Sequence, residues 1–386
     1  MSISSPNPSH AWHGPESLPS PIYVEISPLL TRHLTGIGRF VARLVEGLSH
    51  VTSLRLVNTI QGVHARNMGL SKILRCGSEI VVPRGSLTSA DGDVQAWTKK
   101  LLRGPQCPHD FDLAKRSAAI FTMLRPGERH FRRELIILYD FTSMLLPWAH
   151  VDETRIHFGR LFSESAQLCD NLIAISESTK QDASWMCEVT NDRVVVGYPG
   201  PSLCVADHCA QGPVVRRKDL LLMVSTLEPR KNGVFLLDWF RKTKVLSEQF
   251  ELCWVGPDGW NLSGVREAAQ DNQDRKVRFP GMVSDEELCR LYRQATLSIY
   301  PSLYEGFGFP VLDSLRHGTP VLCGYNSSLK EFAGPGVFFF DACDPQSLDE
   351  ACRALLAGPR KLPARQELDQ VYSWDELAHK TVSLCA

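Results

Sequence analysis

The chain has 386 residues, of which 43% are hydrophobic and 22% charged, and its formal net charge is −1. This length suggests two domains or three, with enough apolar residues to form full cores. The near-zero net charge argues against a nucleic-acid-binding protein, and no apolar run reaches the roughly eighteen residues that a membrane span needs.

The first 20 residues are rich in Ser and Pro and lack the basic and then apolar pattern of a signal peptide. We therefore expect a disordered lead-in over residues 1–20 and a cytoplasmic protein. None of the twelve cysteines forms a C-x-x-C pair, and none of the twelve histidines belongs to an H-E-x-x-H motif. The sequence thus favours reduced, buried thiols over disulfides, and it predicts no metal site.

Short apolar runs alternate with helix-like stretches in both halves of the chain. Those of the first half, expected over 21–204, occur at 21–27, 51–59, 134–140, 171–178 and 193–200. Those of the second half, expected over 205–365 and opened by a polar linker at 205–219, occur at 220–226, 250–257, 277–283, 296–302, 319–325 and from 336. The alternation predicts an α/β fold with two Rossmann-like lobes and a cleft between them.

Four polar clusters follow such strand-like runs, namely ILYDF, AISES, EPRKN and EGFGFP. In α/β sheets, ligands bind outside the carboxyl ends of the strands. We therefore expect all four clusters at the ligand-binding edge.

The stretch YPSLYEGFGFPVLDSL places Glu305 before two glycines, Gly306 and Gly308. Pro310 suits the first position of a helix, which would put Asp313 in the first turn. A glycine loop before a helix N-terminus favours an anion site, most naturally for phosphate. The alternative is a helix-capping loop with one aspartate that complements the helix dipole.

The EPRKN turn places two adjacent cations, Arg230 and Lys231, between a strand-like run and a helix-like one. Adjacent cations at the ligand-binding edge suit a diphosphate, whose charge needs fixed donors. A solvated basic turn is the alternative, and the EGFGFP loop in the same lobe favours the phosphate interpretation.

STLEPRKN, YPSLYEGFGFPVLDSL, HGTPVL and the TGIGR turn together resemble the retaining GT-B glycosyltransferases of group 1, of the family 4 type and a mannosyltransferase-like subgroup. The resemblance covers about residues 21–386 and is strongest from 220 to 345. VYSWDELA (371–378) is similar to the terminal helix of that family, which crosses back to the N-terminal lobe and is expected here over 366–386.

The resemblance implies roles for residues of both lobes. Glu305 would contact the donor sugar near its reacting carbon, and Asp313 would hold the ribose hydroxyls. Lys231 and Arg230 would neutralise the diphosphate. The backbone expected to approach the donor belongs to Gly36, Gly38, Gly306, Phe307, Gly308 and Phe309. The transferred sugar would keep its anomeric configuration, and no metal or other cofactor would be needed, because protein cations stabilise the leaving group.

The chain departs from the family pattern at three positions. Asp313 stands where the family usually has Glu, Thr226 where many members have Arg, and Tyr139 where many have the His that precedes Asp140. Thr226 and Tyr139 remain possible donor or acceptor contacts. Asp140 would orient the acceptor or the sugar, unless it only caps the strand end. Ser176 would contact donor or acceptor, but a helix N-cap is the better interpretation.

Two further segments allow a functional interpretation. Asp91-Gly92-Asp93 looks like the metal-binding motif of another glycosyltransferase fold, but its turn-rich surroundings favour a tight turn. Residues 95–133 carry nine Lys and Arg against three Asp and Glu, with interleaved aromatic residues. This segment would meet an anionic membrane or a lipid-diphosphate acceptor, or else form a solvated helical face.

These observations predict a retaining hexosyltransferase that uses a nucleoside diphosphate sugar of the GDP-mannose or UDP-glucose type. The acceptor would be a hydroxyl of a glycan or a lipid-linked glycan, in polysaccharide or O-antigen assembly at the inner membrane face. Two alternatives stay open: a catalytically silent nucleotide-sugar-binding protein, and a GT-B sugar-nucleotide epimerase.

Overall fold

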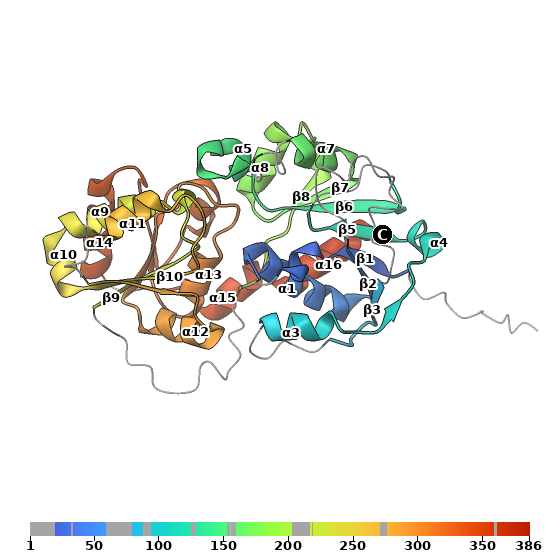
Figure 1. The fold of residues 1–386 in the computed structure, drawn as a ribbon, viewed down its shortest axis with the longest axis horizontal. Coiled ribbons are helices and arrows are strands. Elements are labelled where there is room, and N and C mark those ends of the chain that lie inside the picture. Colours follow the sequence, from blue (N-terminus) through green and yellow to red (C-terminus); the bar gives the residue numbers. More distant parts are fainter. Residues whose placement is uncertain are drawn as a thin grey trace, which may run out of the picture.

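The computed structural model describes residues 20–31, 34–58, 79–87, 94–123, 125, 129–152, 155, 160–202, 217, 219–270, 276–358 and 361–386. Two lobes lie side by side, each with its own sheet and flanking helices (Figure 1). The predicted α/β class with two Rossmann-like lobes is therefore confirmed. Most of the expected lead-in, nearly all of the expected linker and the Asp91-Gly92-Asp93 motif lie outside the described residues, so the boundary at 204/205 stays a prediction.

Eight strands form the sheet of the N-terminal lobe, in the order β4-β3-β2-β1-β5-β6-β7-β8. They are β1 Ile22–Glu25, β2 Leu54–Val57, β3 Glu79–Val82, β4 Gln106–Cys107, β5 Ala118–Phe121, β6 Arg133–Leu138, β7 Asn171–Ala174 and β8 Val194–Val196. Neighbours pair in parallel except around β3, which is antiparallel to both β2 and β4. The sequence did not predict β3, β4 or β5, and β3 makes this end of the sheet antiparallel.

The helices of this lobe follow the strands, as the alternating pattern predicts. They are η1 Ser27–Leu30, α1 Gly36–Val51, α3 Val94–Leu101, α4 Phe111–Ala114, α5 Thr142–Leu145, η3 Pro147–Ala149, α7 Arg160–Leu168, α8 Glu177–Met186 and η4 Asn191–Arg193. Thr35 caps α1, since its side chain accepts a hydrogen bond from the N–H of Gly38. The TGIGR turn thus opens a helix, as expected.

Six strands form the sheet of the C-terminal lobe, in the order β11-β10-β9-β12-β13-β14, and all pair in parallel. They are β9 Leu220–Val224, β10 Glu251–Val255, β11 Val277–Gly281, β12 Leu297–Tyr300, β13 Val321–Gly324 and β14 Val337–Phe340. The intervening helices are η5 Pro229–Lys231, α9 Gly233–Lys242, α10 Lys244–Gln249, α11 Ser263–Gln270, α12 Asp285–Gln294, α13 Phe309–Arg316, η6 Ser327–Phe332 and α14 Pro345–Ala357. Every strand of this lobe lies within a run expected from the sequence.

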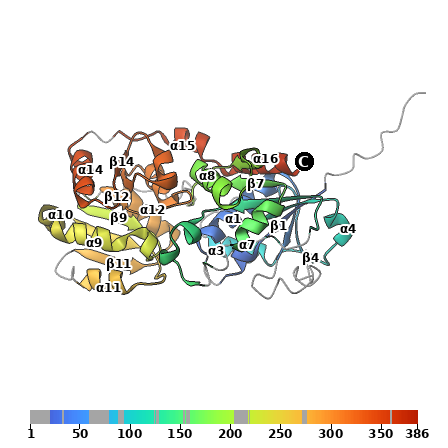
Figure 2. The same ribbon diagram turned by 90° about the horizontal axis from the view of Figure 1, so that it is seen from above.

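The chain ends with α15 Arg365–Val371 and α16 Trp374–Cys385, and α16 lies among the elements of the N-terminal lobe (Figures 1 and 2). A Cβ added to Gly47 of α1 would lie 3.0 Å from the carbonyl oxygen of Trp374, so the two helices pack at close range. The Arg132 guanidinium donates hydrogen bonds to the carbonyls of Cys385 and Ala386 at the helix end. The last helix therefore ties the two lobes together.

The nine cysteines of the described residues are free, and most of them are buried. This agrees with the expected reduced thiols. No helix in this described part of the chain combines the length and the apolar character needed to cross a bilayer.

His317 makes the stability of the C-terminal lobe sensitive to pH. It lies buried at the end of α13, with Nδ1 2.6 Å from the carbonyl oxygen of Asp313 and its ring stacked on Tyr292. Burial lowers the pKa of His317 to about 4. As the pH falls from the ordinary histidine pKa of about 6.5 towards 4, the unfolded chain binds a proton that the folded chain does not. Stability should therefore fall over this range, by about 3 kcal/mol.

The check is urea unfolding of the wild type and a His317→Gln variant at about pH 7 and about pH 5. The wild type should lose more stability between the two pH values than the variant does. Equal losses in the two proteins would contradict the assignment of this pH dependence to His317.

Candidate active site

The loop between β12 and α13 is shaped by glycine and proline. Gly308 is the N-cap of α13, with φ +116°, a conformation that side chains rarely adopt. The helix begins at Phe309, so Pro310 occupies its second position rather than the first. Asp313 therefore lies beyond the first turn of the helix, although the sequence had predicted it within that turn. The prediction was wrong because it placed the start of the helix one residue too late.

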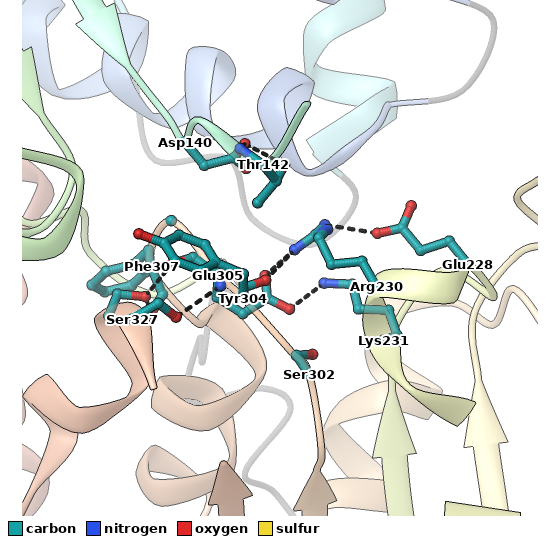
Figure 3. Close-up of polar contacts among 12 residues, drawn as sticks. Asp140, Thr142, Glu228, Arg230, Lys231, Ser302, Tyr304, Glu305, Phe307 and Ser327 are labelled. Carbon is teal, nitrogen blue, oxygen red and sulfur yellow. Dashed lines mark hydrogen bonds and ion pairs between the residues drawn. The ribbon is translucent and has the colours of Figure 1, made fainter. Parts of the chain in front are cut away.

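Glu305 is buried in this loop and pairs with both cations of the EPRKN turn. Its Oε1 lies 2.6 Å from Lys231 Nζ, and its Oε2 lies 2.7 Å from Arg230 Nη1 (Figure 3). Burial alone would raise the pKa of Glu305, but the charges of Arg230 and Lys231 outweigh it and hold the pKa at about 2. Glu305 is therefore ionised at any pH at which the protein is expected to work.

A second buried carboxylate, Glu228, balances this cluster. Its Oε1 lies 2.7 Å from Arg230 Nη2, and the pKa of Arg230 is raised by the two carboxylates even against its own burial. Burial and the charge of Arg230 lower the pKa of Lys231, whose Nζ also donates to the Tyr300 hydroxyl at 3.1 Å. The contact to Glu305 opposes this shift of the pKa and favours the charged form of Lys231. Two cations and two carboxylates thus form a neutral group without a ligand.

The backbone of the EGFGFP loop leaves hydrogen-bond donors free beside this cluster. Among the described residues, no acceptor meets the N–H groups of Gly306, Phe307, Gly308 and Phe309. The other side of the loop is fixed, because the Ser328 hydroxyl bonds to the carbonyls of Glu305 and Phe307 at 2.9 and 2.7 Å. The rings of Phe307 and Phe309 face the aromatic residues of the C-terminal segment. The loop therefore offers its N–H groups, and not its side chains, to an anion.

Asp140 approaches the cluster from the N-terminal lobe, just after β6. It faces the Arg230–Glu305 pair across the space between the lobes (Figure 3). Its Oδ1 accepts hydrogen bonds from the N–H of Thr142 at 3.0 Å and the Thr142 hydroxyl at 2.6 Å. Asp140 thus caps the turn after the strand, as one interpretation of the sequence predicted, while it also faces the opposite lobe.

Tyr139 brings the two lobes into contact through its backbone. A Cβ added to Gly306 would lie 1.9 Å from the carbonyl oxygen of Tyr139 and 2.9 Å from Cβ of Asp140. The side chain of Tyr139 is buried against Phe40 of α1, with ring centroids 5.1 Å apart. Tyr139 therefore does not present its ring to the space beside Glu305.

Gly306→Ala should lower kcat/KM by about 10²-fold, because a methyl group there forces the lobes apart by a distance that catalysis does not tolerate. Neither lobe should unfold, since Gly306 does not have a positive φ and the clash lies at the contact between lobes. The matched control is Gly334→Ala, where a Cβ would have its nearest neighbour at 3.9 Å. Full activity in Gly306→Ala would contradict the closed arrangement of the lobes.

Ser176 is the N-cap of α8, since its Oγ accepts a hydrogen bond from the N–H of Thr179 at 3.0 Å. The capping interpretation is thus the one that the structure supports. The Thr179 hydroxyl lies 3.2 Å from the carbonyl oxygens of both Tyr139 and Gly306, so α8 also holds the lobe contact. Glu331 of η6 adds to this contact by accepting hydrogen bonds from the first N–H groups of the helix.

Asp313 contacts the segment that leaves the N-terminal sheet. Its carboxylate accepts hydrogen bonds from the N–H of Ser202, at 3.1 Å, and from the Ser202 hydroxyl. The residue is only 3% exposed. The structure thus places Asp313 beside Ser202, and the ribose-binding role stays a prediction.

The remaining predicted site residues lie at the margins of this cluster. Gly36 has open space around it, and Gly38 packs against Leu34 in the first turn of α1. The next residue, Arg39, forms a two-bond ion pair with Asp285 of α12, which brings this turn to the opposite lobe. The Thr226 methyl group packs near Gly259. The roles predicted for these residues in binding the sugar donor stay predictions.

One interpretation of the sequence predicted a solvated helical face over residues 95–133, but these residues do not form one. The segment contains α3, β4, α4 and β5, and Phe121 and Phe131 are buried in the core. Arg125 pairs with Glu134 in the interior, at 2.5 Å. Several of its basic residues thus serve the fold, and membrane contact by this segment stays a prediction.

Sequence reasoning did not single out several residues that build the site. Glu228 opens the EPRKN turn, and its place between a strand-like run and two cations is the signal that the sequence offers. Thr179, Ser328 and His150 carry no local signal, because their contacts involve residues of distant segments.

The chain is similar in sequence to known glycosyltransferases. Residues 209–370 match the family described as glycosyl transferases group 1. The chain is 24% identical over 272 residues to the O-antigen chain mannosyltransferase B of Escherichia coli, which covers 65% of this chain and 69% of that protein. It is 26% identical over 243 residues to the serotype-specific mannosyltransferase WbdA of Escherichia coli, covering 57% of this chain but 29% of that protein.

Solved structures show the same fold over nearly the whole chain. Sucrose-phosphate synthase of Thermosynechococcus elongatus superposes with a TM-score of 0.63 at 17% identity, covering 95% of this chain and 98% of that one. Anabaena HepE, solved in complex with UDP and glucose, gives a TM-score of 0.59 at 14% identity and covers 94% and 98%. Residues 209–370 of the C-terminal lobe thus match the group 1 glycosyl transferases, and the chain has the two-lobed GT-B fold of these solved structures.

Proposed function

We propose that the protein transfers a hexose, with retention of configuration, from a nucleoside diphosphate sugar to a hydroxyl of a glycan or lipid-linked glycan. The observation that carries the proposal is the group of Glu305, Lys231 and Arg230, beside a loop with four backbone N–H groups that have no acceptor in the described part of the chain. GDP-mannose is the first donor to test, because the curated relatives are named mannosyltransferases, and UDP-glucose is the second. Polysaccharide or O-antigen assembly at the inner membrane face is the proposed setting.

The donor diphosphate would bind where cations and N–H groups converge. Its negative charges compete with Glu305 for Lys231 and Arg230, and the N–H groups at residues 306–309 add donors at the start of α13. Glu228 stays with Arg230 and keeps the guanidinium in place. Glu305, released in part from the cations, would then contact the donor sugar near its reacting carbon.

The transfer itself needs one bond made and one broken. The acceptor oxygen forms a bond to the anomeric carbon while the bond from that carbon to the diphosphate oxygen breaks. The acceptor proton passes to the leaving phosphate oxygen on the same face, and the cations stabilise the charge that remains. Asp140 would orient the reacting sugar or the acceptor from the N-terminal lobe. A ribose diol would replace Ser202 as the hydrogen-bond donor to Asp313.

The first experiment is a thermal-shift screen with UDP, GDP, ADP and their sugar conjugates. A ligand that binds only the native protein raises Tm by an amount set by its concentration relative to Kd. A shift with one base, followed by product formation when glycan acceptors are added, is the expected result. Binding without turnover would identify a silent nucleotide-sugar-binding protein, and conversion of the donor without any acceptor would identify an epimerase. No shift with any nucleotide in a folded protein would overturn the proposal.

A further inference from the structure

The segment after Asp140 contacts the C-terminal lobe through an aromatic pair. It runs through α5 and η3, and His150 is the residue at which η3 ends. The Trp260 Nε1–H, in the loop after β10, donates a 2.6 Å hydrogen bond to the carbonyl of Ala149. The rings of His150 and Trp260 lie 5.8 Å apart at an interplanar angle of 34°. The two lobes thus meet at a second place near the candidate active site.

The loop that carries Trp260 packs closely on the chain that leads into the EPRKN turn. A Cβ added to Gly259 would lie 2.5 Å from the carbonyl oxygen of Leu227, and one added to Gly256 would lie 1.9 Å from that of Ser225. Gly256 also has φ +152°. The backbone beside Trp260 is therefore fixed, and its indole N–H is held by the hydrogen bond to Ala149.

Both ring nitrogens of His150 are buried, and neither has a hydrogen-bond partner among the described residues. A buried polar group without a partner costs about 1–3 kcal/mol, and here there are two on one ring. Such a cost is tolerated where a ligand supplies the missing partners. Both nitrogens of His150 are therefore available to a partner that the described residues do not supply.

The surroundings of His150 define the chemistry of that partner. Burial and the charge of Arg230 lower the pKa of His150, while Asp140 and Glu228 oppose them weakly. The imidazole is thus neutral, with one N–H donor and one acceptor nitrogen. His150 follows Ala149, which accepts the hydrogen bond from Trp260, and the neighbouring Gly259 packs on Leu227, the residue before Glu228. The ring nitrogens therefore lie beside the segment that carries the cations of the candidate active site. A hydroxyl group, which both donates and accepts, is the partner that matches a neutral imidazole.

We propose that His150 binds a sugar hydroxyl in the active site, with Trp260 as the aromatic surface that holds the imidazole and packs beside the sugar. This inference rests on the proposed function and adds a specificity-determining residue to it. The sugar is either the hexose of the donor or that of the acceptor, and the two cases predict different kinetic effects. In both, the residue selects a sugar with a hydroxyl at one position, because an analogue without it leaves the nitrogens unpaired.

The test compares the wild type with His150→Phe, which keeps the ring contact to Trp260 and removes both nitrogens, and with His150→Gln, which restores one amide. His379→Phe is the matched control, because His379 is exposed on α16. Binding of GDP-mannose, UDP-glucose and the free nucleotides is measured by thermal shift, and kcat and KM are measured for donor and acceptor.

A donor role predicts that His150→Phe weakens binding of the nucleotide sugar at least about tenfold and leaves binding of the free nucleotide unchanged. An acceptor role predicts unchanged donor binding and a KM for the acceptor raised by a similar factor. His150→Gln should recover part of either loss. Equal donor binding, KM and kcat in His150→Phe and the wild type would overturn the inference while leaving the proposed function intact. A wild type that binds no nucleotide sugar would overturn both.

Discussion

Lys231→Met should lower kcat/KM for the nucleotide sugar by about 10²-fold or more, because it removes a preorganised cation from the proposed diphosphate site. Lys231 is buried and pairs with Glu305 at 2.6 Å, so its charge acts in surroundings that screen it poorly. Loss of the thermal shift with free nucleoside diphosphate should accompany the loss of activity. Steady-state kinetics and thermal shift, measured on the same preparation, check both expectations.

The matched control is Lys242→Met. Lys242 lies at the end of α9 in the same lobe, and its side chain is 69% exposed. Lys242→Met should keep full activity and the full nucleotide shift. Lys231→Arg should bind nucleotide more tightly than Lys231→Met does, because a cation is restored. If Lys231→Met binds nucleotide as the wild type does, Lys231 does not hold the diphosphate.

Glu305→Gln should affect both stability and turnover. The substitution keeps the shape of the side chain but leaves two buried cations with Glu228 as their remaining carboxylate partner in the cluster. Removal of one member of a buried ion pair costs about 3–5 kcal/mol. Turnover should fall at least about 10²-fold, because Glu305 is proposed to contact the donor sugar near its reacting carbon. Urea unfolding and kinetics measure the two effects separately.

Glu228→Gln separates the structural effect of Glu305 from its catalytic one. It also removes a buried carboxylate from Arg230, so it should destabilise the protein by a similar amount. Its kcat should fall much less than that of Glu305→Gln, since Glu228 is not proposed to contact the donor sugar. Equal losses of kcat in the two variants would show that Glu305 only maintains the cluster.

The low pKa of Glu305 determines how its contribution to the free energy of unfolding changes at acid pH. Because the pKa is about 2 in the folded protein and 4.5 in its ordinary state, the contribution is complete above about pH 5. It is lost as the pH falls towards 2, and the total is about 3 kcal/mol. An acid limb of kcat/KM near neutral pH, which reports the free enzyme, therefore cannot arise from protonation of Glu305.

Local patterns in the sequence determined the strands of the C-terminal lobe, the helix that follows the TGIGR turn and the glycine loop before α13. The strands and the helix depend on the alternation of apolar and polar residues, and the loop depends on the backbone freedom of Gly308. Neighbours in the chain decide both properties. The sequence did not indicate β3 to β5, because these strands are short: β4 has two residues, and β3 and β5 have four each. Single apolar runs of that length carry little signal.

Only the tertiary structure decided which partners the site residues have. Glu305 meets Lys231 across 74 positions of sequence, Asp313 meets Ser202 across 111, and Thr179 meets Gly306 across 127. The surroundings of His150 were decided in the same way, because its ring contacts Trp260 of the other lobe. Local periodicity reports the face that a residue presents, whereas the partner on that face is set by the packing of distant segments. The sequence thus indicated the residue types for the chemistry. The fold of the C-terminal lobe paired Glu305 with Lys231, and the packing of the two lobes paired Asp313 with Ser202 and Thr179 with Gly306.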